Sequence, residues 1–410
     1  MDPSAALATV VRDERARLVA TLVRDYGFDL AEEAIDAAVE AALVQWPAEG
    51  APASPRAWLL SVARRRAIDR VRHARRATSA HADLRAFAPE EADVEADPDA
   101  AGFPDDRLRL LFTCCHPAIA REAQIALALR WLSGLSTEDV ARAFCVPVPT
   151  MAQRLTRAKT KIEIAKIPYE VPERGELSSR LGAVLEVIYA IFNEGYVATA
   201  GAELQRVDLA DEALRLAELV GVLLPASAEP KALLALLLLV HARRHARVTA
   251  DGDLVPLEEQ DRSRWDHQAI ARGKELLVAS LALGPASAYA IEASIHAVHD
   301  EAPSYAETDF RQIVHLYEML RAKTAAPVVA VNAVVARAVV EGPAAALERL
   351  AALEVDAALR EHPALAAAKA DLLRRAGRAG EARAAYSAAI RATSNEAERR
   401  FLACRRDALG

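Results

Sequence analysis

The sequence predicts an all-α protein in which two small helical domains precede a longer, repeat-like helical region. Hydrophobic residues make up 53% of the 410 residues and aromatic residues only 5%, a balance that favours helices over sheets. In the second half, segments rich in alanine and leucine alternate with short breaks that contain glycine or proline. The length exceeds that of one ordinary domain and indicates two or three.

Several classes of protein are disfavoured by the composition. The longest apolar run, residues 232–240, is too short to cross a bilayer. The first residues lack the basic segment of a secretory signal. The four cysteines, at positions 114, 115, 145 and 404, form no CxxC pair, so neither a disulfide framework nor a zinc site is expected. We therefore expect a cytoplasmic protein with no membrane contact, no metal and no cofactor.

Charge is distributed unevenly along the chain, although the net charge is −7. Residues 1–166 hold 23 basic and 24 acidic residues, but eight of those acids lie in the segment 87–106, which contains no base. Two basic segments thus flank an acidic connector, and a more acidic half follows. Local positive fields, rather than the whole-chain charge, decide contact with phosphates. From its charge alone, the connector is interpreted as a solvated spacer.

The first basic segment, residues 56–76, contains eight arginines and one aspartate. Positions 60, 64, 67 or 68 and 71 recur at helical spacing, which predicts a helix with an apolar side. Trp58 could stack on a base, although a core aromatic is the favoured alternative. The arginines are expected to contact phosphates, and a solvated surface helix is the alternative. These candidates are Arg64, Arg65, Arg66, Arg70, Arg72, Arg75 and Arg76.

An acidic helix is predicted over residues 30–46. Ile35, Val39 and Ala42 or Leu43 fall on one face, and acids fall on another. Acids spaced in this way do not stabilise an isolated helix, so they form either a solvated face or a docking surface for a basic partner. The acids are Glu32, Glu33, Asp36 and Glu40.

The second basic segment, residues 134–162, predicts a helix-turn-helix. Ser136 and Asp139 resemble a capping box, with Thr137 as the alternative cap. A short helix should end near residue 144, and a second should run from about residue 149 to 166. Met151, Leu155, Ala158 and Ile162 should face inward. An ordinary αα-hairpin is the alternative. The residues left to point outward are Gln153, Arg154, Arg157, Lys159 and Lys161.

The half that follows reads as a helical solenoid or a repeat-like bundle. Helix pairs are expected at 207–224 with 229–247, 286–299 with 308–322, 327–340 with 343–353, and 364–376 with 380–392. Ala382, Tyr386 and Ala389 sit at tetratricopeptide-like offsets. The polar clusters 193–196 and 261–266 are interpreted as structural networks, with a ligand or partner surface as the alternative. Core packing, rather than metal binding, is expected for Cys114, Cys115 and His116. Surface or core positions are expected for His241 and His245.

Together these segments resemble a known family. The first 166 residues resemble a bacterial RNA polymerase sigma factor of the extracytoplasmic-function (ECF) group. AEEAIDAAVEAALVQW is similar to the helix that docks on the polymerase clamp, SPRAWLLSVARRRAIDRVRHARR to the helix of minus-10 recognition and melting, and GLSTEDVARAFCVPVPTMAQRLTRAKTKI to region 4. LLFTCCHPAI, IFNEGY and EEQDRSRWD are similar to a subset with a C-terminal tetratricopeptide-like (TPR-like) extension. The chain departs from the family at Asp36–Ala37, at Cys145 and at residues 149–151.

The resemblance implies a domain order and a function. It implies a region 2 domain at 1–86, an acidic flexible linker at 87–105, a region 4 domain at 106–167 and a TPR-like regulatory domain at 168–410. As an alternative to a solvated spacer, the resemblance also implies that the linker could mimic nucleic acid inside the polymerase. The protein would bind core RNA polymerase at the clamp and flap and direct initiation at promoter DNA, without catalysis of its own. Glu32, Glu33, Asp36 and Glu40 would bind polymerase. Region 4, which in the family reads the minus-35 element, would use Thr150 with the five outward residues of its second helix.

Three hypotheses follow for the whole chain. In the first, the C-terminal half regulates a sigma factor by contacting its own regions 2 and 4, the polymerase or a partner. In the second, the protein is a helix-turn-helix regulator with a repeat sensor domain that does not bind core polymerase. An enzyme with an appended DNA-binding module is the weakest, because no phosphate loop, nucleophile motif or metal spacing accompanies it.

Overall fold

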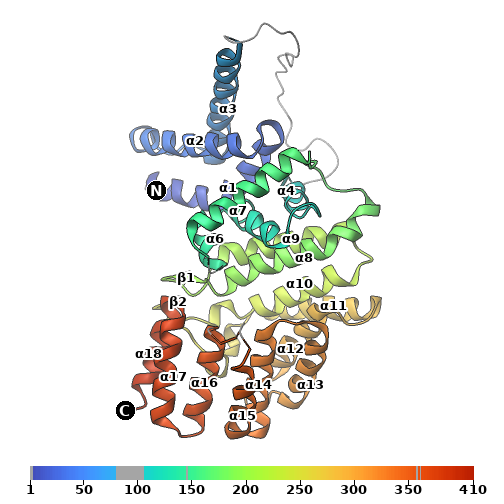
Figure 1. The fold of residues 1–410 in the computed structure, drawn as a ribbon, viewed down its shortest axis with the longest axis vertical. Coiled ribbons are helices and arrows are strands. Elements are labelled where there is room, and N and C mark those ends of the chain that lie inside the picture. Colours follow the sequence, from blue (N-terminus) through green and yellow to red (C-terminus); the bar gives the residue numbers. More distant parts are fainter. Residues whose placement is uncertain (1–2, 80–105, 145, 357–358, 361) are drawn as a thin grey trace. The chain divides into compact units, whose positions relative to one another are not determined.

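The computed structural model describes residues 3–79, 106–144, 146–356, 359–360 and 362–410. These residues form eighteen α-helices, three short 3-10 helices and a single pair of two-residue strands, which confirms the all-α prediction (Figure 1). The chain divides into two compact units, residues 1–187 and 188–410. The boundaries predicted at residues 86, 105 and 167 divide the first part more finely and stay predictions. The predicted linker, 87–105, lies outside the described residues.

The first unit begins with three helices that pack on one another. They are α1 (Pro3–Tyr26), α2 (Phe28–Glu49) and α3 (Pro55–Ser79). Trp46, Ile35 and Leu59 lie almost fully buried between them. Gly27 joins α1 to α2 at a positive φ of 75°, a conformation that glycine adopts without strain.

The buried face of α2 includes Ile35 and Ala42, as predicted, whereas the stripe predicted for α3 differs from the observed one. On α3 the buried residues are Leu59, Val62, Ala63 and Ala67, whereas Ile68 is 37% exposed. On α2 the buried face continues through Ala42 to Trp46, and Leu43 is 55% exposed. The predicted stripe of α3 was wrong because it passed through Arg64, a side chain that is costly to bury unpaired.

The rest of the first unit contains α4 (Asp106–Cys114), α5 (Arg121–Trp131), α6 (Thr137–Ala143), α7 (Val148–Ile164) and the start of α8 (Arg174–Tyr196). Cys114 and Cys115 are fully buried beside Phe112 and Leu111, as core residues would be. Burial raises the pKa of the Cys115 thiol to about 12, so this thiol is neutral and packs as a small apolar group.

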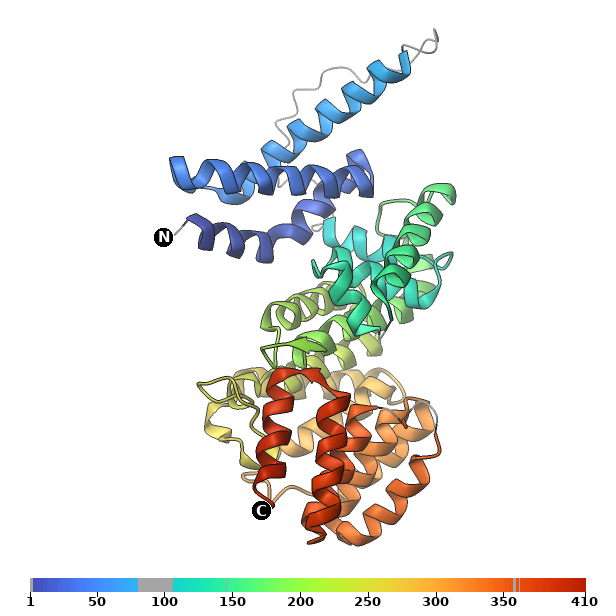
Figure 2. The ribbon, with the colours of Figure 1, turned by 60° about the vertical axis from the view of Figure 1, so that its left-hand side comes forward.

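The second unit is a succession of helical hairpins after α8. Its helices are α9 (Val207–Leu223), α10 (Ala228–His241), α11 (His267–Leu283), α12 (Ala288–Glu301), α13 (Phe310–Lys323), α14 (Pro327–Glu341), α15 (Pro343–Leu353), α16 (Pro363–Arg375), α17 (Ala379–Ala392) and α18 (Glu396–Asp407). From α12 to α18 each helix packs against the next along the chain, which Figure 2 shows in orange and red. The four predicted helix pairs are therefore present, and Ala382, Tyr386 and Ala389 are buried.

Two features of the second unit were not expected. Helix α11 was missed, although Asp266 caps it by accepting a hydrogen bond from the Ala269 backbone (2.9 Å). A parallel pair joins β1 (Ala200–Gly201) to β2 (Ser394–Asn395). Asn395 is 1% exposed, and its Nδ2 donates to the carbonyl oxygens of Ala198 (2.8 Å) and Glu203 (2.9 Å). This amide ties the start of α18 to the loop after α8.

Candidate nucleic-acid interface

The hairpin of α6 and α7 is built by a capping box and an apolar stripe. The Asp139 backbone N–H donates to Ser136 Oγ (3.0 Å), and the Ser136 N–H donates to Asp139 Oδ2 (3.2 Å). Burial opposes ionisation of Asp139, but hydrogen bonds from Ser136 and Arg142 outweigh it and lower the pKa of this carboxyl. Ser136, and not the alternative Thr137, is thus the cap.

The exposed face of α7 carries the residues predicted to read DNA. Met151, Leu155, Ala158 and Ile162 are buried, as expected from their spacing. The side of the helix away from them is polar and basic, which is the composition of a helix that meets phosphates and base edges. Thr150, Gln153, Arg157 and Lys161 are exposed, whereas Arg154 and Lys159 are half-buried.

Helix α3 presents most of its arginines to solvent. Arg65, Arg66, Arg70 and Arg72 are exposed, and Arg64 is half-buried. The side chains of Arg75 and Arg76 lie outside the described residues. Trp58 packs edge-on against the buried Trp46 with ring centroids 5.6 Å apart, a contact that favours its alternative role as a core aromatic.

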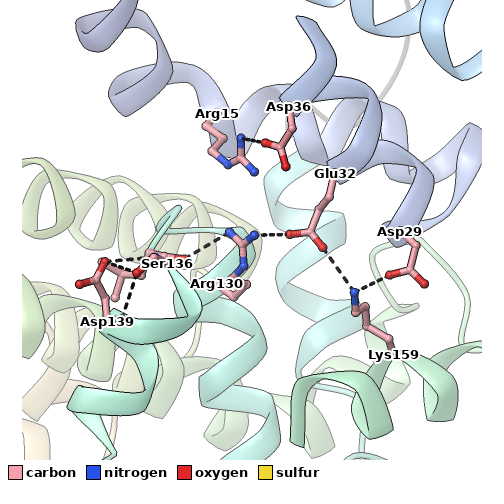
Figure 3. Close-up of polar contacts among 9 residues, drawn as sticks. Arg15, Asp29, Glu32, Asp36, Arg130, Ser136, Asp139 and Lys159 are labelled. Carbon is pink, nitrogen blue, oxygen red and sulfur yellow. Dashed lines mark hydrogen bonds and ion pairs between the residues drawn. The ribbon is translucent and has the colours of Figure 1, made fainter. Parts of the chain in front are cut away.

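Three of the four predicted polymerase-binding acids on α2 form ion pairs within the first unit (Figure 3). Asp36 Oδ1 lies 2.8 Å from Arg15 Nη1 on α1, and Glu33 pairs with Arg70 on α3. Glu40 is exposed. The carboxylates of Asp36 and Glu33 are at least half exposed, and exposed ion pairs contribute at most about 1 kcal/mol. They leave the acidic face of α2 open to a competing basic partner.

Glu32 differs from the other acids because its partners lie on α5 and α7. Its side chain is 14% exposed, and its Oε1 lies 2.7 Å from Arg130 Nη2 at the end of α5. Its other oxygen lies 3.5 Å from Lys159 Nζ on α7, and the same ammonium pairs with Asp29. Figure 3 shows the two acids of α2 and the two bases facing each other. Lys159, which was predicted to contact DNA, forms ion pairs with these two acids in this structure.

Apolar and neutral contacts accompany these ion pairs. Phe28, at the start of α2, stacks on Trp131, at the end of α5, with ring centroids 3.8 Å apart. The Tyr169 hydroxyl bridges the carbonyl oxygens of Ala20 (2.6 Å) and Asp106 (2.9 Å). A buried, stacked aromatic pair flanked by ion pairs is a packed contact rather than a chance approach. The face of α2 predicted to dock is therefore partly covered by the helices predicted to bind DNA.

The sequence analysis named Glu32 and Lys159 but missed their neighbours on both sides of this contact. The sequence did carry a signal for Asp29, because an acid is favoured in the first turn of a helix and Asp29 lies in that of α2. Phe28, Arg130 and Trp131 had none, because their pairing joins segments about a hundred positions apart.

The polar cluster 193–196 is a structural network, in agreement with the interpretation from the sequence. Glu194 accepts hydrogen bonds from the backbone and hydroxyl of Thr199, and the Arg247 guanidinium lies 3.4 Å from the ring centroid of Tyr196. Gly195 is needed because a Cβ there would lie 2.4 Å from the backbone nitrogen of Ala210. His241 is buried, and its Nε2 lies 3.0 Å from Asp211 Oδ1.

No helix in the described part of the chain is both long and apolar enough to cross a membrane.

The fold and this interface define an all-α protein with a basic, capped helical hairpin in its first unit and stacked hairpins in its second. Comparison with known proteins adds a family. The chain is 40% identical over 405 residues to an uncharacterized protein of Rhizobium meliloti (strain 1021), a match that covers 96% of this chain and 94% of that protein. The chain therefore belongs to the same family. Residues 180–281 also match a family of unknown function (DUF6596), and no solved structure matches.

Proposed function

We propose that the protein is a sigma factor of the ECF type, which binds core RNA polymerase in the cytoplasm and directs initiation at specific promoters. The observation that supports this best is the combination, in one unit, of two helices with exposed basic faces and a third with an acidic face. Helices α3 and α7 carry arginine or lysine opposite buried stripes, as helices that follow phosphates do. Helix α2 carries the acids that a basic polymerase surface would contact.

The roles follow from the chemistry of each face. Helix α7 would read the minus-35 element through the exposed residues Thr150, Gln153 and Arg157, with Arg154 and Lys161 beside them. Helix α3 would follow the phosphates of the minus-10 region, where the fork of each guanidinium suits two phosphate oxygens. The second unit, with its succession of hairpins, would act as a TPR-like regulatory domain. The protein would recognise and position DNA without catalysing a reaction.

The first experiment is co-elution of the full chain with purified core RNA polymerase on a sizing column. We expect a stable complex with the wild-type chain and a weaker one with the double variant Asp36→Lys, Glu40→Lys, because reversed charges repel a basic partner. Glu122→Lys, an exposed acid on α5, is the matched control and should bind as wild type does. Failure of the wild-type chain to bind would favour the helix-turn-helix regulator that does not bind core polymerase.

A second pair of variants tests DNA recognition. Arg154→Gln with Arg157→Gln should reduce transcription from a cognate promoter while core binding is retained, since these side chains lie on α7 and not on α2. The outcome against the proposal is full promoter activity with both arginines removed.

A further inference from the structure

A cavity of about 390 Å³ lies inside the second unit, among residues of α12, α13, α14, α16, α17 and α18. Small-molecule pockets have volumes of about 300 to 1,000 Å³, so this one suits a compact ligand. Its wall is largely apolar and includes five tyrosine or phenylalanine rings. The aromatic residues are Tyr305, Phe310, Tyr317, Tyr386 and Phe401. Such a wall favours a flat or apolar body through burial and ring contacts.

One buried polar side chain in this wall lacks a partner. His299 lines the cavity and is 9% exposed, and its Nδ1 makes no hydrogen bond to the described residues. Unpartnered polar atoms are also found on three residues around it, at Arg262 Nη2, Trp265 Nε1 and Asp300 Oδ2. Buried polar groups in native proteins are almost always hydrogen-bonded. Of these four residues, His299 lines the cavity, so its Nδ1 is the unpartnered polar atom that a bound molecule could meet.

The surroundings of His299 also decide its charge. Burial, with Arg243 and Arg262 close by, lowers the pKa of this imidazole to about 3. Arg262 is fixed beside it, because its Nη1 donates to the carbonyl oxygens of His299 and Ala302. The ring is therefore neutral near pH 7 and offers one donor and one acceptor, which suits an uncharged polar group of a ligand.

A cation also lines the cavity. The side chain of Arg375 is 27% exposed, and its Nη1 lies 3.9 Å from Asp371 Oδ2, beyond hydrogen-bond distance. Asp371 is instead committed to Arg374, whose Nε and Nη2 donate to its Oδ1 at 3.0 and 2.7 Å. Asp371 itself lines the cavity, and the other charged lining residues are Glu258, which is exposed, and Arg405, which pairs with Glu259. Arg375 is thus the lining cation whose donors are least used.

We propose that this cavity binds a small carboxylic acid with an aromatic or similarly apolar body. The body would lie among the tyrosine and phenylalanine rings, the carboxylate would meet the guanidinium of Arg375, and His299 would hydrogen-bond a polar group on the body. A ligand there would bridge α12–α14 and α16–α18 and stabilise their packing. All lining residues belong to the second unit, so this binding site does not depend on whether the first unit binds polymerase.

The test uses the full chain and two probes of matched shape, 3-phenylpropionate and its neutral analogue 3-phenylpropionamide, with binding measured by calorimetry and by thermal shift. We expect the acid to bind about tenfold more tightly than the amide, because only the acid forms a charge-assisted pair. Arg375→Gln should remove this preference and leave amide binding unchanged. Arg399→Gln, an exposed arginine on α18, is the control and should keep the preference.

Three results would overturn the proposal. They are equal affinity of the two probes for the wild-type chain, a preference for the acid that survives Arg375→Gln, and no binding of either probe at millimolar concentration. Circular dichroism checks that each variant is folded. If Arg375→Gln does not fold, Arg375→Lys takes its place: it keeps the charge without the planar fork, so acid binding should weaken while amide binding does not. Unchanged acid affinity in that variant would also count against the site.

Discussion

At the level of single residues, the second unit buries a charged cluster around Arg243. The Arg243 Nε donates to Asp300 Oδ1 (2.8 Å), and its Nη2 contacts His296, while Trp265 lies under the guanidinium with its centroid 5.2 Å away. Burial lowers the pKa of His299 to about 3 and that of His296 well below its usual value, and burial raises the pKa of Asp300 to about 6. Because the pKa values of these three groups differ between the folded and the unfolded chain, the stability of this unit depends on pH.

The signs of these contributions can be worked out separately. Below pH 6.5 the unfolded chain protonates both histidines and the folded chain does not, so each histidine lowers stability as the pH falls. Asp300 acts in the opposite direction, because its folded form takes up a proton near pH 6, before the unfolded form does. Two histidines outweigh one aspartate, and the cluster therefore destabilises the fold as the pH falls below 6.5.

We predict that His299→Gln reduces this pH dependence. Between pH 7.5 and 5.5 the free energy of unfolding of the wild type should fall by about 1 kcal/mol more than that of the variant, since one displaced histidine contributes up to about 1.4 kcal/mol per pH unit. Urea unfolding at the two pH values measures this difference. A stability gap between the two proteins that stays constant with pH would contradict the assignment of a neutral, buried His299.

At the level of elements, helix positions followed from the sequence more closely than their buried faces did. The hairpin α6–α7 was predictable because its cap, its proline start and its stripe are all local signals. The buried face of α3 was not, because it depends on where α1 and α2 touch the helix. Helix α11 was missed although its cap, Asp266, is also a local signal.

The cap of α6 supplies a prediction at this scale. Ser136→Ala removes the acceptor for the Asp139 N–H and should lower the free energy of unfolding of the first unit by about 1 kcal/mol. Thr137→Ala, at the next position, is the matched control and should change stability by less than about 0.5 kcal/mol. Chemical unfolding, followed by tryptophan fluorescence, to which Trp46, Trp58 and Trp131 of this unit contribute, measures both. Equal losses in the two variants would mean that Ser136 does not act as the cap.

At the scale of the molecule, the predicted surfaces lie in the same unit but partly cover each other. Sequence patterns placed acids on α2 and bases on α7 correctly, yet they gave no sign that Glu32 and Asp29 would meet Arg130 and Lys159. The charge pattern of each helix is set by its own residues, whereas the contact of α2 with α5 and α7 forms only when the whole unit folds. A partner that needs the acidic face of α2 must compete with these internal cations.

The last prediction follows from that competition and depends on the proposed function. Arg130→Gln with Lys159→Gln should increase the affinity of the full chain for core RNA polymerase by about fivefold. Loss of the internal pairs raises the fraction of molecules in which α2 is accessible, and apparent affinity follows that fraction. Arg157→Gln removes a charge from the exposed face of α7 and should leave polymerase affinity unchanged. Fluorescence anisotropy with labelled protein measures the affinities, and an unchanged or weaker affinity in the double variant would mean that the internal pairs do not restrict docking.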